Sequence, residues 1–385
     1  MKKTIKLAVV AALALGATSA FATNGSTMIS TGAKATGMAG VGIGMSHGAE
    51  SALTNPALIT SVKNKEVSFG GTFFMPNVSF DNGVGAGAQD SAADKSMIPA
   101  VALAAKITDN FYMGVGMWGT AGMGVDYRDS AANMNMVTNL QLMQFGLPLA
   151  YTTHGFSAAV TPIIQYGALD INYAGSTTQG VAQDIQFGYN LGLSYEIKGF
   201  TVGAVYKSQI DMKYKGQISQ AMSDFTGAPA SMFSDKLSTP AEVGAGISYT
   251  IKGSTIALDY KNIAWSKAKG YEDFKWKDQN VYSIGYEYAA TNWAARVGYN
   301  YAESPISDQG AAGGLINQFN LMGFPAIIES HIAIGGTYNV SEGTSFDLAY
   351  VYSPEVSNTY SGMMGQPITT KHSQSSVSAQ VNFAF

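Results

Sequence analysis

Through most of this chain apolar and polar residues alternate one by one, and this alternation limits the fold more than any other feature. In 184–197 every odd-numbered residue is apolar, whereas every even-numbered residue is polar or glycine. Successive side chains on a β-strand point to opposite faces, so such a segment has one apolar and one polar face. The alternation recurs in 200–214, 242–251, 254–262, 280–288, 292–301, 330–340, 344–352 and, at the C-terminal end, 377–385.

The length of these segments favours a membrane barrel over a soluble sandwich. They run from 9 to 15 residues, whereas a tilted bilayer-crossing strand needs roughly 9–11 and strands of soluble proteins average about 5–6. Only 12% of the residues are charged, against roughly 25% in soluble domains. The aromatic residues expected in the interfacial girdles of such a barrel are Trp118, Tyr214, Tyr260, Trp265, Trp293, Tyr301, Tyr352 and Tyr360.

The lengths of the connections predict the topology. Tight turns such as Lys198-Gly199 alternate with long polar segments such as 215–240, and outer-membrane barrels have short periplasmic turns and long external loops. We therefore predict an all-β fold, in which residues 67–385 form a 14-stranded antiparallel transmembrane β-barrel. Its strands are expected at 67–80, 98–107, 110–118, 137–150, 156–171, 184–197, 200–214, 241–251, 254–264, 280–289, 292–302, 329–340, 344–353 and 374–385.

The first 22 residues predict export from the cytoplasm. Lys2, Lys3 and Lys6 precede the small-apolar stretch Leu7–Ala17, and Ala20-Phe21-Ala22 fits a signal peptidase site. The alternative, a short buried helix, would make both the basic flank and the cleavage site coincidental. A signal peptide at 1–22 and a barrel together predict a location in the outer membrane of a Gram-negative bacterium.

Charge and rare residues exclude several classes of function. Removing the three lysines of the signal leaves 19 basic against 26 acidic residues, a net charge of −7, which argues against nucleic-acid binding. There are no cysteines, so no disulfide or thiol chemistry is expected. The four histidines lack metal-ligand spacing and no serine or aspartate is set as a nucleophile or base beside them. We therefore expect no enzyme activity, no cofactor and no metal site.

The segment 23–66 does not alternate, and we expect it to fold back into the lumen as a hatch, or plug. It is rich in Gly, Ala, Ser, Thr and Met, and its low charge argues against the alternative of a disordered tail. Glycines that face inward by parity would leave room for a plug or a ligand, and they are Gly188, Gly192, Gly244, Gly246 and Gly298.

Within that segment, TGAKATGMAGVGIGMSHGAESALTNPALIT resembles the hatch of the FadL family of outer-membrane long-chain fatty acid and hydrocarbon transporters. The family's Asn-Pro-Ala motif is matched by Asn55, Pro56 and Ala57. The C-terminal Phe385 resembles the signal by which the barrel assembly machinery recognises its clients. The resemblance implies a passive, hatch-gated channel for hydrophobic compounds.

In that family the third strand is kinked and opens the wall sideways, so the resemblance assigns a lateral opening to Gly114 and Gly116. Packing of these glycines against the hatch is an alternative role. The same stretch matches the dinucleotide fingerprint as a bare pattern, but no βαβ unit surrounds it.

Two predicted external loops are unusually apolar and are candidates for ligand capture. Exposed apolar clusters often mark interaction sites, although these loops could instead pack on each other as a lid. The residues expected to capture ligand are Met222, Phe225, Met232, Phe233, Phe319 and Phe324.

Arg296 faces inward by parity and is a candidate anchor for a fatty acid carboxylate, with Lys207 and Lys261 as further candidates. The alternative for Arg296 is an internal partner, either Glu287, Asp259 or Asp347 in an ion pair or a backbone carbonyl of the hatch, because lumen charges usually pair.

Two further functions remain open, a water-filled diffusion porin and a surface adhesion barrel. For an uptake channel the expected partners are a hydrophobic small molecule and the lipids of the outer membrane, and one chain would suffice as a monomer. Long-chain fatty acids, alkanes and monoaromatic hydrocarbons all remain possible ligands.

Overall fold

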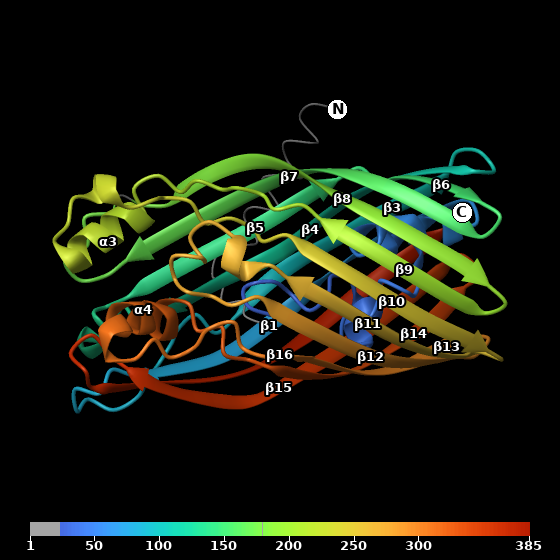
Figure 1. Cartoon of the computed structure of the whole chain (residues 1–385). Coiled ribbons are helices and arrows are strands. Elements are labelled where there is room, and N and C mark those ends of the chain that lie inside the picture. Colours follow the sequence, from blue (N-terminus) through green and yellow to red (C-terminus); the bar gives the residue numbers. More distant parts are fainter. Residues whose placement is uncertain (1–23, 179) are drawn as a thin grey trace.

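Antiparallel strands make up most of the chain and close on themselves as a barrel (Figure 1). The computed structural model describes residues 24–178 and 180–385; the predicted signal peptide lies outside these residues. The strands are β1 Lys65–Asp81, β2 Gln89–Asp90, β3 Ser96–Lys106, β4 Phe111–Asp126, β5 Val137–Gly146, β6 Leu149–Thr153, β7 Phe156–Asn172, β8 Ala182–Ile197, β9 Phe200–Lys207, β10 Glu242–Ile251, β11 Ser254–Ile263, β12 Gln279–Ala289, β13 Trp293–Ala302, β14 Ser330–Ser341, β15 Thr344–Ser361 and β16 Pro367–Ala384.

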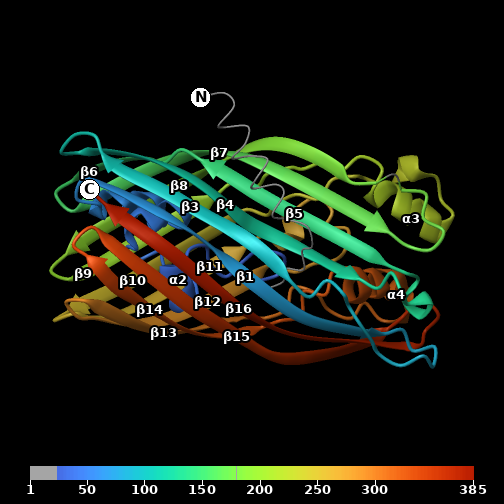
Figure 2. The ribbon, with the colours of Figure 1, turned by 180° about the vertical axis from the view of Figure 1, so that it is seen from behind.

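The sixteen strands occupy fourteen positions around the wall of the barrel, as predicted. The two-residue β2 is only a short addition to β1. β5 and β6 are successive pieces of one wall position, since both pair with β4 and with β7. The barrel closes where β1 pairs with β16 along nearly its whole length (Figure 2). Closure leaves no free sheet edge in the wall, which is what a strand protein needs in lipid.

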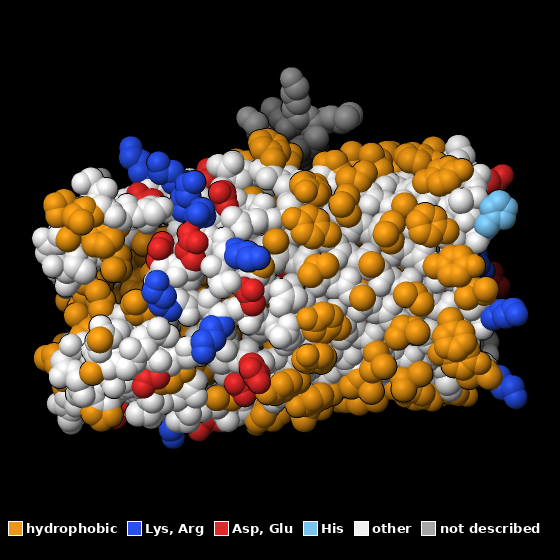
Figure 3. Space-filling view, viewed as in Figure 1, with side chains coloured by type: hydrophobic (Ala, Val, Ile, Leu, Met, Phe, Trp, Pro, Cys, Tyr) orange, Lys and Arg blue, Asp and Glu red, His pale blue; other side chains and the backbone are white. Residues whose placement is uncertain are grey.

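The alternation predicts the two faces of the wall correctly. On β8 the odd-numbered residues from Ile185 to Ile197 are 41–73% exposed, and Figure 3 shows apolar side chains spread over the visible face of the barrel wall. The even-numbered residues of the same strand face the lumen. The apolar side chains thus meet lipid, and the polar ones and glycines line the interior.

Several strand ends differ from the sequence prediction. The strand predicted at 200–214 ends at Lys207, after which the chain enters an external loop. In contrast, β4 runs to Asp126, and β15 and β16 form a hairpin that extends to Ser361 and back from Pro367. The outer ends of β4, β15 and β16 lack the alternation because beyond the bilayer the outer face is no longer apolar. In 208–214 the alternation continues into a loop, where Ile210, Met212 and Tyr214 are buried instead of facing lipid.

The strand predicted at 137–150 is interrupted at Leu147 and Pro148. Proline has no N–H to donate to a ladder, so a break at this residue is expected on physical grounds.

The helices are short and lie in the lumen or the external loops. Those before β1 are α2 Ala33–Gly37, η1 Gly48–Leu53 and η2 Pro56–Ser61. Those in the loops are η3 Ala131–Asn133, α3 Ile218–Thr226, η4 Ala230–Met232, η5 Trp265–Lys267, η6 Ala311–Gly313, α4 Gly314–Gln318 and η7 Phe319–Gly323. In the described residues, no helix has both the length and the apolar character required to cross a membrane.

Three of the expected girdle aromatics are not at the membrane interface. Trp118, Tyr214 and Trp265 are each at most 2% exposed and lie inside the barrel or its loops. Trp118 has the inward parity of β4, and the other two lie beyond the ends of β9 and β11, where parity no longer applies. Tyr260, Trp293, Tyr301 and Tyr352 are exposed on the outer wall, as expected.

Candidate functional site

Residues 24–64, which we call the hatch, fill the part of the lumen nearest the tight turns (blue in Figure 1). One wall carboxylate holds the centre of this segment. Asp259 on β11 accepts hydrogen bonds from the backbone N–H groups of Gly42 and Ile43 at 2.7 Å each and from Gly44 at 3.2 Å. Ser248 on β10 donates to the carbonyl of Gly44 at 2.7 Å. The chain turn at 42–44 is therefore fastened to the wall by directional contacts.

Asn55, the first residue of the Asn-Pro-Ala motif, ties the hatch to β8. Its side-chain Nδ2 donates to the carbonyls of Ile43 at 2.8 Å and Leu193 at 3.1 Å, and its Oδ1 accepts from the N–H of Ala57 at 3.1 Å. The last contact caps η2, with Pro56 at its first position, where a proline is favourable. The motif is buried and joins two hatch segments to the wall.

Glycines in the wall let the hatch backbone approach closely. A Cβ atom on Gly203 would lie 1.8 Å from the carbonyl oxygen of Ile43, and one on Gly192 would lie 2.3 Å from Oδ1 of Asn55. Gly192 was expected to leave such room; Gly203 was not singled out, although it shares the inward parity of β9. Four of the five predicted inward glycines thus lie against the hatch or its carboxylate anchor, whereas Gly188 lies against Ile210 of an external loop.

A second carboxylate, Glu50 of η1, organises the other end of the hatch. It accepts from the backbone N–H groups of Lys34 and Ala35 at the start of α2, at 3.1 and 2.8 Å. Gln380 on β16 donates to the same carboxylate at 2.9 Å. Glu50 is fully buried, so these donors supply the hydrogen bonds that water would otherwise provide.

The wall is irregular at β4, the third strand to cross it. β3 pairs with β4 only as far as Ala100 opposite Trp118, and the register between β4 and β5 shifts between Gly119 and Ala121. Beyond that point the first residues of the hatch pair with the edge of β4 that β3 no longer covers. Met28 donates its N–H to the carbonyl of Thr120 at 3.2 Å, and Gly122 donates to Ser26 at 3.0 Å.

Gly114 and Gly116 lie nearer the start of β4 than this irregularity, in the part of β4 that is still paired with β3. Gly114 donates its N–H to the carbonyl of Pro148, at 2.9 Å, across the interruption between β5 and β6. A Cβ on Gly116 would lie 2.7 Å from the ring of Trp118 and 3.0 Å from Leu53 of the hatch. The expected strand is thus irregular at Gly119–Ala121 and also beside Gly114, where the neighbouring wall strand is interrupted between β5 and β6. The part of Gly114 and Gly116 in a lateral opening remains a prediction.

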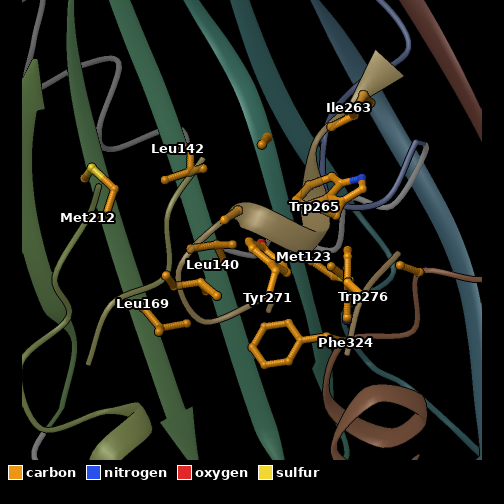
Figure 4. Close-up of a cluster of buried hydrophobic side chains, with 14 of the residues drawn as sticks. Met123, Leu140, Leu142, Leu169, Met212, Ile263, Trp265, Tyr271, Trp276 and Phe324 are labelled. Carbon is orange, nitrogen blue, oxygen red and sulfur yellow. The ribbon is translucent and has the colours of Figure 1, made fainter. Parts of the chain in front are cut away.

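Three external loops close the other end of the lumen, and we call residues 208–241, 264–278 and 303–329 the lid. Their buried apolar side chains meet those of β4, β5 and β7 inside the barrel mouth (Figure 4). The ring of Trp265 lies 4.6 Å from that of Tyr271 and 5.0 Å from that of Trp276. Trp276 also donates to Asn320, at 3.0 Å, and so links two of the loops.

The structure corrects the assignment of Phe319 and Phe324 to an exposed capture surface. Both are 3% exposed and pack inside the lid, with their rings 5.3 Å apart. For Phe319 and Phe324 the alternative prediction, that the loops pack on each other as a lid, is the correct one. The folded loops place these two side chains against other aromatic rings.

The other capture candidates lie on α3 and η4 at the outer end. Phe225 packs on Tyr173, with ring centres 4.8 Å apart, and Met222 is likewise partly buried. Phe233 is half-buried and Met232 is 73% exposed. Of the six candidates, Met232 alone presents a largely exposed apolar side chain, so a role in capture remains a prediction.

Each of the three candidate carboxylate anchors already has an acidic partner. Nε of Arg296 lies 2.6 Å from Glu287, and its Nη1 lies 2.8 Å from Thr337 and 3.8 Å from Asp347. Lys207 and Lys261 both contact Glu242. The alternative of an internal ion pair is therefore what the geometry shows for Arg296, and any role in ligand binding remains a prediction.

A small cavity connects these features. Its lining includes hatch residues 27–31, Trp118 and Thr120 of the irregular strand, and the charged side chains of Lys207, Glu242, Asp259 and Lys261. It measures about 50 Å³, which holds only a few water molecules. With the hatch in place, the lumen therefore has no room here for a hydrophobic ligand.

Sequence reasoning missed Glu242 and Trp118 as lumen residues, although both have the inward parity of their strands. It named Asp259 only as a partner for Arg296. Among residues 24–178 and 180–385, no three His, Asp or Glu side chains come together to hold a metal ion.

Comparison with known proteins agrees with this architecture. The model of the family described as outer membrane protein transport protein (OMPP1/FadL/TodX) matches residues 10–385. The 47 kDa outer membrane protein of Pasteurella multocida is 26% identical over 409 aligned positions, covering 89% of this chain and 92% of that protein.

Two solved structures are similar in fold. A Pseudomonas aeruginosa FadL homologue has a TM-score of 0.73 at 14% identity, covering 94% of this chain and 100% of its own. The toluene transporter TodX of P. putida has a TM-score of 0.70 at 15% identity, covering 92% and 99%. The family match over nearly the whole length, together with the barrel, shows that this chain belongs to the OMPP1/FadL/TodX family of outer-membrane transport proteins.

Proposed function

We propose that this protein is a passive channel that takes up small hydrophobic compounds, with the hatch as its gate and a lateral exit through the wall. One observation carries the proposal: residues 24–28 contact both the lid and the irregular strand. The hydroxyls of Ser26 and Tyr271 of the lid lie 3.0 Å apart, and a Cβ on Gly25 would lie 2.5 Å from the ring of Trp265. Two residues further on, Met28 pairs with β4.

This contact links the entry of a compound at the lid to its exit into the membrane. A hydrophobic compound that enters the lid replaces apolar contacts between its side chains, and this displaces residues 24–28 from Trp265 and Tyr271. The same displacement removes these residues from β4 and frees the space between β3 and β4. The compound leaves there into the apolar interior of the bilayer, where its transfer from water is most favourable.

The body of the hatch favours this lateral exit over a straight one. A passage straight to the periplasm would break the hydrogen bonds of Asp259, Asn55 and Glu50, and a hydrophobic ligand offers no replacement for any of them. Residues 24–28 are held instead by their contacts with the lid and with β4, which a compound entering the lid disturbs directly.

Proteins of similar fold support a hydrophobic cargo. TodX and the Ralstonia pickettii protein TbuX are described as toluene transporters, and CymD is described as a monoaromatic hydrocarbon channel. Outer-membrane lipids receive the cargo, the barrel assembly machinery inserts the chain, and a single chain contains the whole route.

A disulfide lock tests the gate, because the chain has no cysteine of its own. Thr27 lies directly opposite Ala121, and facing residues in an antiparallel pair have Cα atoms about 4.5–5.5 Å apart, within disulfide range. In cells that lack their own transporter, the Thr27→Cys/Ala121→Cys variant should take up labelled toluene only after reduction.

The matched control is Ala204→Cys/Ala245→Cys, a facing pair in the wall between β9 and β10, for which uptake should not depend on reduction. Unimpaired uptake by the oxidised gate variant would exclude a gate at residues 24–28. A high ionic conductance of the wild type in planar bilayers would instead favour a water-filled porin.

A further inference from the structure

Two lysines in the lumen converge on a single carboxylate. Nζ of Lys207 lies 3.3 Å and Nζ of Lys261 lies 3.7 Å from the same oxygen, Oε2 of Glu242. The strand register produces this arrangement, since Glu242 on β10 faces Lys207 on β9 while its neighbour-but-one, Gly244, faces Lys261 on β11. The Glu242 side chain is 8% exposed and that of Lys261 is 16% exposed, so all three charges lie within the lumen.

Two ammonium groups around one carboxylate form the arrangement that would bind the head group of a fatty acid. Here the carboxylate belongs to the protein. Glu242 occupies the place between the lysines that a ligand carboxylate would need, and Asp259, the second acid of the same cavity, is already bound to the hatch backbone. The cavity thus contains two basic and two acidic side chains, and its formal charges cancel.

The other basic groups in this part of the lumen are matched in the same way. Arg296 pairs with Glu287 and lies near Asp347, and Lys34 of the hatch lies 3.9 Å from Glu66. A fatty acid anion would have to lose its hydration and displace an internal carboxylate that would then be left buried without a partner, and both steps are costly. An uncharged compound incurs neither cost.

The rest of the cavity suits an uncharged ligand. Trp118 presents an aromatic ring, Ile43, Val205 and Val281 present apolar side chains, and Thr27 and Thr120 are also part of the lining. Once residues 24–28 move away, this surface lies directly beside the irregular part of β4.

We propose that Glu242 determines specificity: by filling the site between Lys207 and Lys261, it makes the channel select uncharged hydrophobic compounds and reject carboxylates. This inference rests on the proposed uptake function and names its substrate class. Glu242 acts by occupying the position between the two lysines that a ligand carboxylate would need.

The first test uses the wild-type chain and a matched pair of probes, 1-octanol and octanoate, which differ only at the head group. Liposomes or cells with the full-length protein should take up labelled 1-octanol well above the rate of membranes without it, whereas octanoate at pH 8 should show no gain. Equal gains for the two probes would overturn the proposed specificity. No gain for 1-octanol or for toluene would instead overturn the uptake function itself.

The second test frees the two lysines with Glu242→Gln, which keeps the size of the side chain. Octanoate uptake should rise by about tenfold or more, because an unoccupied pair of ammonium groups favours an anion, while 1-octanol uptake stays within about twofold. The matched control is Glu272→Gln, which removes an exposed lid carboxylate that is paired with Lys269 and should change neither rate.

A triple variant, Glu242→Gln/Lys207→Gln/Lys261→Gln, separates charge from packing. It should lose the gain for octanoate and keep uptake of 1-octanol, since no cation remains in the cavity. Heat-modifiable migration on gels verifies that each variant has folded. If the folded Glu242→Gln protein shows no gain for octanoate while it still carries 1-octanol, Glu242 has no part in specificity.

Discussion

The two ends of the lumen are closed by different kinds of interaction. The hatch is fastened by directional hydrogen bonds to wall and hatch polar groups, among them Asp259, Asn55 and Glu50. The lid buries a large apolar cluster around Trp265 and Trp276, and its hydrogen bonds to the wall, such as those that Thr138 and Thr370 donate to the carbonyls of Gly323 and Leu321, surround that cluster. Both closures contain fully buried apolar side chains, so the difference lies in the balance between apolar packing and hydrogen bonds to buried carboxylates.

This difference indicates which closure a hydrophobic ligand can open. Apolar packing is non-directional, and a ligand can replace one side chain with another surface of similar character. A hydrogen bond to a buried carboxylate needs a donor in a defined place. A hydrophobic compound can therefore enter the lid but cannot take over the contacts of the hatch body, and the short segment 24–28 is where the two closures meet.

The largest effect is expected from Asp259→Ala, which removes the acceptor of three hatch N–H groups. Hydrogen bonds to charged groups contribute about 1.5–3 kcal/mol each, so the loss of three should weaken hatch seating by about 4.5–9 kcal/mol. Planar-bilayer recordings should then show open events that the wild type lacks. Asp94→Ala, at an exposed loop carboxylate, is the control and should leave the conductance unchanged; closed channels in both variants would show that Asp259 does not hold the hatch.

Next in size is Trp276→Ala in the lid. Loss of a large buried aromatic side chain costs about 3–5 kcal/mol in a packed core, and here it also removes the contact with Asn320. Hydrogen exchange should speed up in 264–278 and 303–328, while exchange in the hatch stays slow. Equal acceleration in the hatch would mean that the two closures are one cooperative unit, contrary to the comparison above.

Asn55→Ala should have a smaller effect on the hatch than the loss of Asp259. The substitution removes one helix cap and two contacts to neutral carbonyls, at a cost of about 1–2 kcal/mol. Toluene uptake should fall while the barrel remains folded and heat-modifiable. A chain that no longer folds would make the Asn-Pro-Ala motif essential for assembly and not for gating.

The smallest effect is expected from acid at the outer loops. Partial burial raises the pKa of the Asp224 carboxyl, but hydrogen bonds from Tyr173, Thr177 and Gln220 outweigh it and lower the pKa to about 2. Because the folded-state pKa is depressed, the contribution of Asp224 to stability is full above its ordinary value of 3.8 and is lost as the pH falls towards 2.

Limited proteolysis at 173–178 should therefore accelerate between pH 4 and pH 2 with an acid-active protease. Asp224→Asn should remove that change and behave alike at both pH values. An unchanged acceleration in the variant would assign it to another group.

Some of the site was predictable from the sequence because it depends on local order. Parity placed Arg296, Lys207 and Gly192 in the lumen, and the Asn-Pro-Ala motif located Asn55. Glu242 and Trp118 share this inward parity, but Trp118 was expected in the interfacial girdle and nothing in the sequence singled out Glu242. Phe319 and Phe324 were misplaced because apolar residues in a polar loop look exposed until the loop is folded onto its neighbours.

By itself the sequence determined the barrel, the number of wall strands and the face of each strand, because a period of two residues follows from the geometry of every extended segment. Only the tertiary structure decided the interior. The convergence of Lys207 and Lys261 on Glu242 depends on the register of three strands, and the pairing of residues 26–28 with β4 depends on where β3 stops. These contacts join residues far apart in the chain, and they form only when the closed wall brings its strands into one register.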